Sequence, residues 1–194
     1  MAAASFMVAL CLAITGLASA QGMKGQDEAM SRMMKLGSPG VHHKALEAFI
    51  GKWNYTVTSR MMPHAPPMVM KGTSENKWIL GGRFIEQDVT GNDSQHPFEG
   101  VGLIGFDNIQ QQYTSTWVDS MSTGKMEGTS QFNKATQTFR EEGTVSCPMT
   151  GQKHRRYSST IKIIDQNHYT YEMYMWDNHG REFKSMEIDY TRAE

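Results

Sequence analysis

The side chains of this sequence that could carry acid–base chemistry are carboxylates within segments of alternating polarity. The candidates are Glu86, Asp88, Glu99, Asp119, Glu172 and Glu187. Two carboxylates that converge on one site can act as general acid and general base. Glu187, however, lies between Met186 and Ile188, so on an extended strand it faces away from their apolar surface. We interpret these carboxylates as a solvated strand face and predict no catalytic residue and no enzyme activity.

A small barrel enzyme, an isomerase or a hydrolase, is the alternative to this interpretation. It requires at least one ionisable side chain that faces the interior with a shifted pKa. The side chains to examine for that role are Glu86, Asp88, Asp119 and Glu172.

Methionine and histidine side chains form two dense groups that could bind a soft metal ion. One is Met61, Met62, His64, Met68 and Met70, and the other is Met30, Met33, Met34, His42 and His43. Thioether and imidazole ligands select copper(I), but neither group has a regular spacing, and methionine commonly fills gaps in cores. We predict no metal site and no cofactor. The alternatives are metal binding and haem binding, with an axial ligand from among His154, His168 and His179.

Three glycines, Gly100, Gly102 and Gly105, could suggest a phosphate-binding loop. They lie within an alternating strand pattern, and no helix follows to offer its N-terminus to an anion. A glycine inside a strand more often marks a bend or a close approach of two parts of the chain, and we predict that role here.

Strands must position these residues, because after Gly51 the sequence has a period of two. Trp53, Tyr55 and Val57 alternate with polar residues, as in a strand with one buried face. The same alternation recurs almost to the C-terminus, between short Gly-, Asn- and Asp-rich turns that are typical of antiparallel hairpins. The predicted strands are 52–60, 68–79, 83–90, 97–107, 111–119, 124–133, 136–146, 152–164, 168–176 and 182–192.

A sheet of about ten antiparallel strands must protect its two edges. Closure removes the edges, whereas a sandwich needs longer crossover connections than this chain offers. The predicted fold is therefore all-β, a single antiparallel up-and-down β-barrel of about ten strands. A short helix is expected before the first strand, because Leu46, Phe49 and Ile50 follow a helical spacing.

The two ends of this sheet provide a test of closure. If the first and last strands pair antiparallel, Arg192 lies near Trp53. The guanidinium would then lie over the indole face, an interaction worth about 1–2 kcal/mol when shielded from water. We predict that Gly51, Trp53 and Arg192 close the base of the barrel.

The inward-facing positions are predicted to be mostly aromatic, aliphatic and thioether side chains. They are Tyr55, Val57, Phe84, Phe106, Tyr113, Trp117, Met173, Met186 and Ile188. Such a lining either fills a small barrel or surrounds one apolar ligand. We predict a cavity that binds a small apolar or amphipathic molecule, with its mouth at loops 61–67, 91–96 and 119–123.

Residues 1–20 have the composition of a secretory signal peptide. They carry no charged side chain, contain a long apolar run and end in small residues, so cleavage is expected near Ala20. A Met-rich leader, flexible or helical, is expected over 21–40, and the barrel domain over 41–194. We predict a secreted or periplasmic protein without a transmembrane segment after signal cleavage.

The charge and cysteine content exclude two further classes. The formal net charge is −1 and the strongest basic run is only Lys153 to Arg156, so we expect no nucleic acid partner. Of the two cysteines, Cys11 lies in the signal segment, which leaves Cys147 alone and unable to form an internal disulfide.

Gly51-Lys52-Trp53 at the head of the first strand, with Arg192 closing the last, resembles the signature of the calycin superfamily, the lipocalins and fatty-acid-binding proteins. Five longer runs are similar to a bacterial family, domain of unknown function 1579. They are WILGGRFIEQ (78–87), PFEGVGLIGFDN (97–108), YTSTWVDSMSTG (113–124), PMTGQ (148–152) and GREFKSMEIDYTR (180–192). This resemblance implies a lipocalin-like β-barrel, exported in many members, and no established reaction. Where that pattern usually has an acidic residue this chain has Cys147, so any role of the thiol is particular to this chain.

Overall fold

The structure, a computed structural model, describes residues 23–194 and divides into two units at Pro39. In the first unit residues 23–36, which lie within the leader expected over 21–40, are helical. Its methionines are exposed: Met23, Met30, Met33 and Met34. The expected signal peptide lies outside the described residues. Among residues 23–194, no helix has the length and apolar character needed to cross a membrane.

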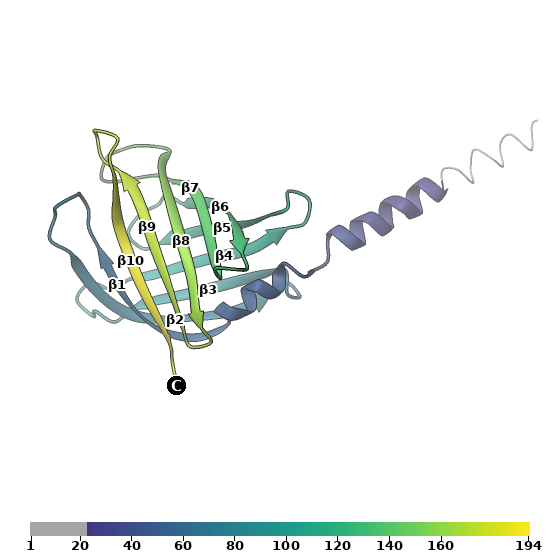
Figure 1. The fold of residues 1–194 in the computed structure, drawn as a ribbon, viewed down its shortest axis with the longest axis horizontal. Coiled ribbons are helices and arrows are strands. Elements are labelled where there is room, and N and C mark those ends of the chain that lie inside the picture. The colour runs from purple at the N-terminus through teal and green to yellow at the C-terminus, as the bar shows by residue number, and fades with distance from the viewer. Residues whose placement is uncertain (1–22) are drawn as a thin grey trace, which may run out of the picture. The chain divides into compact units, whose positions relative to one another are not determined.

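Ten strands form a closed antiparallel barrel in the second unit (Figure 1). They are β1 (Gly51–Ser59), β2 (Met68–Ile79), β3 (Phe84–Gly91), β4 (Glu99–Asp107), β5 (Gln112–Asp119), β6 (Met126–Asn133), β7 (Thr138–Val145), β8 (Arg155–Asp165), β9 (His168–Trp176) and β10 (Glu182–Arg192). Each strand pairs with its neighbours in sequence, and β1 also pairs with β10. The predicted up-and-down barrel is therefore confirmed, and each predicted strand has its counterpart.

The turns between strands use the side-chain chemistry that the sequence suggests. Asp107 Oδ1 accepts the Ile109 N–H at 2.7 Å, and Asn133 Oδ1 accepts the Ala135 N–H at 3.0 Å. These hydrogen bonds between a short polar side chain and the backbone two residues later stabilise tight turns.

A 3₁₀ helix, η1 (His43–Phe49), precedes β1 and covers one end of the barrel. Its buried residues are His43, Leu46 and Phe49, which are three residues apart because a 3₁₀ helix has three residues per turn. The expected short helix is thus present, but its buried face differs from the α-helical expectation. Ile50 is the extended C-cap residue and only partly buried, and His43 takes the third buried position.

Trp53 and Arg192 meet where the barrel closes. They are cross-strand partners of β1 and β10, and the guanidinium carbon lies 4.2 Å from the centroid of the indole ring, as expected. The guanidinium also donates to the Gln166 carbonyl at 2.8 and 3.0 Å and to the Ile50 carbonyl at 3.0 Å. Arg192 therefore ties η1, β1, β10 and the β8–β9 turn together.

Gly51 is required at this junction for two reasons. Its φ of 119° is one that side chains rarely adopt, and a Cβ there would lie 2.6 Å from an Arg192 terminal nitrogen. The Gly-x-Trp motif thus combines a backbone requirement with a packed indole.

Replacing Arg192 with alanine should lower the free energy of unfolding by about 2 kcal/mol, because it removes the cation–π contact with Trp53 and three charged hydrogen bonds. Chemical denaturation monitored by tryptophan fluorescence measures the change. Lys52→Ala is the matched control, since Lys52 is an exposed cation on β1, and it should change stability by no more than about 0.5 kcal/mol. An equally small effect of Arg192→Ala would contradict the closure role.

The antiparallel order places the ends of the strands at two distinct rims. The rim with η1 and Arg192 is the closed base, where the aromatic core lies. The opposite rim carries the loops β1–β2, β3–β4 and β5–β6, which contain all three segments predicted for the mouth, together with β7–β8 and β9–β10. Figure 1 shows η1 beside the C-terminal end of β10, away from the hairpin between β9 and β10.

Candidate ligand-binding lumen

The predicted lining residues separate into two groups by depth. Five are packed into the core with at most 7% of their surface exposed: Tyr55, Val57, Phe106, Tyr113 and Met173. Three others face inward but are only partly buried: Trp117, Met186 and Ile188. The second group is the one that a ligand could touch without displacing the core. Ligand contact by any of them stays a prediction.

Phe84 is a correction to the predicted lining. It pairs with Gly105 on the outer face of the sheet, and its ring covers that glycine. The next residue, Ile85, points inward and is completely buried. Both positions are apolar, but Phe84 shares its face with Glu86 and Asp88, and that charged alternation was the sequence signal for an outward strand face.

Several inward-facing side chains towards the mouth remain partly exposed. Strand pairing places them on the core side of the sheet: Ile104, Ser115, Trp117, Met126, Glu141, Tyr171, Met186 and Ile188. In a closed barrel, exposed area on an inward side chain faces the lumen. These side chains therefore form a partly exposed inner surface between the aromatic base and the mouth.

Glu141 is a charged residue on the inner surface of the barrel, and the sequence pattern did not single it out. It lies opposite Ser159 on β8 and Ser130 on β6. Its Oε2 accepts the Ser115 hydroxyl at 2.6 Å, and its Oε1 accepts the hydroxyls of Tyr157 at 2.7 Å and Ser159 at 3.4 Å. Two strands, β5 and β8, thus supply three hydroxyl donors to one carboxylate.

Two paired glycines make room for this arrangement. Gly128 on β6 lies opposite Gly143 on β7, and a Cβ on either would lie about 2.5 Å from the Tyr157 hydroxyl. The Tyr157 side chain fills the space that these two residues leave and so reaches Glu141. Burial and then the Glu141 charge hold the pKa of Tyr157 well above its usual value, so its proton stays on the phenol.

Tyr171 offers a polar atom without a partner beside this cluster. Its hydroxyl is buried next to Ser159 but forms no hydrogen bond of acceptable geometry with any of the described residues. Burial, and then the Glu141 carboxylate, raise its pKa far above the usual value. Buried polar groups are rarely left unpaired, so among the described residues this hydroxyl is an exception.

The carboxylates named from the sequence do not contribute to the lumen centre. Glu86 and Asp88 both pair with Lys77, at 2.8 and 3.1 Å, and Glu172 pairs with Lys184 at 3.0 Å on the outer surface. Asp119 faces inward, but at the rim, where Oδ2 accepts the Trp117 indole N–H at 2.8 Å. The expected solvated strand face holds for the first three.

The glycines of β4 support close packing, as expected for glycines inside a strand. Gly100 and Gly102 face inward beneath the ring of Trp117, and Gly105 faces outward beneath Phe84. The Trp117 indole therefore packs directly on the β4 backbone, in the space that side chains at positions 100 and 102 would occupy.

The three histidines considered as haem ligands lie outside the lumen. His168 is on the outer face, where its Nε2 lies 2.9 Å from Asp189, and His154 and His179 are exposed in loops. Within residues 23–194, no three His, Cys, Asp or Glu side chains are grouped closely enough to hold a metal ion.

Cys147 lies at the start of the β7–β8 loop, partly buried, with an Arg155 terminal nitrogen 3.5 Å from its sulfur. Burial alone would raise the pKa of the thiol, but hydrogen bonds from Thr150 and Arg155 outweigh that effect and lower it to about 7. The sequence around Cys147 gave no sign of this neighbour, because Arg155 lies eight residues away across the loop.

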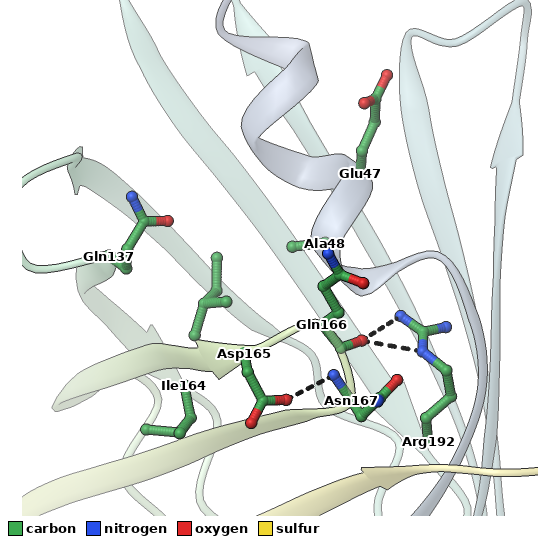
Figure 2. Close-up of a pocket in the computed structure, with 9 residues that line it drawn as sticks. Glu47, Ala48, Gln137, Ile164, Asp165, Gln166, Asn167 and Arg192 are labelled. Atoms are coloured by element: carbon green, nitrogen blue, oxygen red, sulfur yellow. Dashed lines mark hydrogen bonds between the residues drawn. The ribbon is translucent and has the colours of Figure 1, made fainter.

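A groove of about 680 Å³ lies outside the closed base, between η1 and the β8–β9 turn (Figure 2). Its polar atoms are largely paired with each other: the Arg192 guanidinium binds the Gln166 carbonyl, and Asp165 accepts the Asn167 N–H. The groove is separate from the lumen and shares none of its apolar lining, so we do not interpret it as the binding site.

The closed ten-stranded barrel with a short helix at its base defines a lipocalin-like β-barrel protein. Residues 38–192 match a family described as "Protein of unknown function (DUF1579)", and the chain belongs to this family. No curated protein sequence matches the chain.

Two solved structures share the fold at low sequence identity. Rv2717c from M. tuberculosis has a TM-score of 0.59 and 12% identity, covering 81% of this chain and all of its own. The S-type phycobiliprotein lyase CPES from Guillardia theta has a TM-score of 0.54 and 11% identity, covering 83% of this chain and 97% of its own. At these identities the similarity concerns the barrel architecture.

Proposed function

We propose that the protein binds a small apolar or amphipathic molecule in the lumen of its barrel. The observation that carries this proposal is the set of inward-facing but partly exposed side chains above the aromatic base. Removing an apolar ligand from water stabilises the complex by about 25 cal/mol per Å² of buried apolar surface, before ordering costs.

The distribution of polar groups supports binding rather than catalysis as the primary role. The lumen combines apolar walls with one concentrated polar cluster at Glu141, which is the arrangement of sites that orient a small molecule. Because Glu141 faces inward, a small barrel enzyme is the second candidate. One structural neighbour is named a lyase, but its likeness to this chain concerns the fold.

The composition of residues 1–20 supports the further proposal that binding takes place outside the cytoplasm, in a secreted or periplasmic protein cleaved near Ala20. The partner is then a small molecule of that compartment.

A titration with the neutral fluorophore N-phenyl-1-naphthylamine tests lumen binding. Its fluorescence should rise on binding to the wild-type protein. Ile104→Trp should weaken binding by about tenfold or more, because the indole occupies space that the ligand needs. Leu103→Trp is the matched control, since Leu103 is the next residue on β4 and faces outward, and it should leave affinity unchanged. No binding, or equal effects of the two variants, would refute the proposal.

A further inference from the structure

The charge balance of the lumen indicates what kind of polar group a ligand carries. Glu141 faces inward, and within residues 23–194 no lysine, arginine or histidine forms an ion pair with it. Its partners are the three neutral hydroxyls of Ser115, Tyr157 and Ser159. A partly buried carboxylate without a counter-charge favours the approach of a cation.

The inward-facing arginines, Arg155 and Arg192, form hydrogen bonds with groups other than Glu141. Arg155 lies at the rim, near the Cys147 sulfur and the Trp176 carbonyl, each at 3.5 Å. Arg192 lies at the closed base and is bound to Gln166 and Ile50. Neither is paired with Glu141, so no basic side chain neutralises this carboxylate within residues 23–194.

The unused hydrogen-bonding capacity matches an N–H donor group. A carboxylate offers about four lone-pair directions, and the three hydroxyls occupy two on Oε1 and one on Oε2. One acceptor position on Oε2 remains.

We propose that the lumen selects amphiphiles whose polar end is a protonated amine, with the ammonium bound by Glu141 Oε2 and the apolar body held among the inward-facing side chains. Such a bond is charge-assisted, and therefore stronger than a bond between neutral groups. A fatty acid is disfavoured, because its carboxylate would face the Glu141 charge. This inference rests on the proposed lumen binding and adds the class of ligand.

The test compares three probes of equal chain length, decylamine, decanol and decanoate, below their micelle concentrations at pH 7. Each is titrated by displacement of N-phenyl-1-naphthylamine and by calorimetry. Decylamine should bind at least about tenfold more tightly than decanol, a difference of about 1.4 kcal/mol, and decanoate should bind most weakly. Equal affinities for decylamine and decanol would overturn the inference while leaving lumen binding intact. Failure of all three to bind would refute lumen binding itself.

Two substitutions locate the selectivity. Glu141→Gln keeps an acceptor oxygen but removes the charge, and it should reduce the preference for decylamine over decanol to about twofold or less. Glu142→Gln is the matched control, because Glu142 is the next residue on β7, exposed on the outer face, and the preference should persist. Unchanged selectivity in Glu141→Gln would overturn the assignment. Should that variant fail to fold, the comparison of three probes on the wild-type protein still decides between the ligand classes.

Discussion

A Trp53→Ala protein should have a free energy of unfolding about 3–5 kcal/mol below that of the wild type, the cost of truncating a fully packed tryptophan. The indole is 1% exposed and contacts Tyr169 at a ring distance of 4.6 Å. Its N–H donates to the Phe49 carbonyl at 2.9 Å, and Arg192 covers its face. The substitution therefore removes packing, a buried hydrogen bond and the cation–π contact together.

Chemical denaturation followed by far-ultraviolet circular dichroism measures this loss, since the fluorescence reporter is altered. Trp176→Ala is the control: Trp176 is partly exposed at the rim, with Arg156 5.3 Å from its ring, and should lose about 1 kcal/mol. If the two variants were equally stable, the base of the barrel would not be the main packed element of the fold.

The second large effect is expected at Gly128, where alanine should lower the free energy of unfolding by about 3 kcal/mol. The added Cβ would lie 2.5 Å from the Tyr157 hydroxyl and 2.6 Å from the Glu141 side-chain carboxyl carbon, so one of these groups must move. The same change should separate Tyr157 from Glu141 and weaken binding of decylamine.

Gly40→Ala is the control for the Gly128 prediction, because a Cβ at Gly40 meets no atom within 4 Å. Its stability should stay within about 0.5 kcal/mol of the wild type. Urea denaturation compares the two variants. A Gly128→Ala protein of wild-type stability would show that the Tyr157 side chain is not closely packed against Gly128.

The barrel architecture could be predicted from the sequence because each strand has a recognisable local pattern. Period-two alternation and polar turns predict the ten strands. The contact of Trp53 with Arg192 follows from pairing the first strand with the last. Where two neighbouring residues are both apolar, the alternation does not show which of them faces the interior. The prediction that Phe84 faces inward was wrong for that reason, because Ile85 takes that position.

The polar site was harder to predict, because its parts come from separate hairpins. Phe139, Glu141 and Gly143 alternate on one face of β7, and this parity could have placed Glu141 inside. Nothing local to those residues reveals that Ser115 and Tyr157 reach the same carboxylate, because that depends on the register of β5 through β8. The buried face of η1 was also only partly predicted from the sequence. The helix has 3₁₀ geometry, so His43 is buried beside Leu46 and Phe49, whereas the α-helical spacing had predicted Ile50.

The most direct test of lumen binding is a nuclear magnetic resonance titration of protein labelled at its methionine methyl groups. Met126 and Met186 face the lumen, whereas Met23, Met30 and Met33 are exposed in the helical segment 23–36. On addition of N-phenyl-1-naphthylamine, the methyl signals of Met126 and Met186 should shift and those of the exposed methionines should stay in place. Shifts confined to the exposed methionines, or no shift at all, would contradict a ligand-binding lumen.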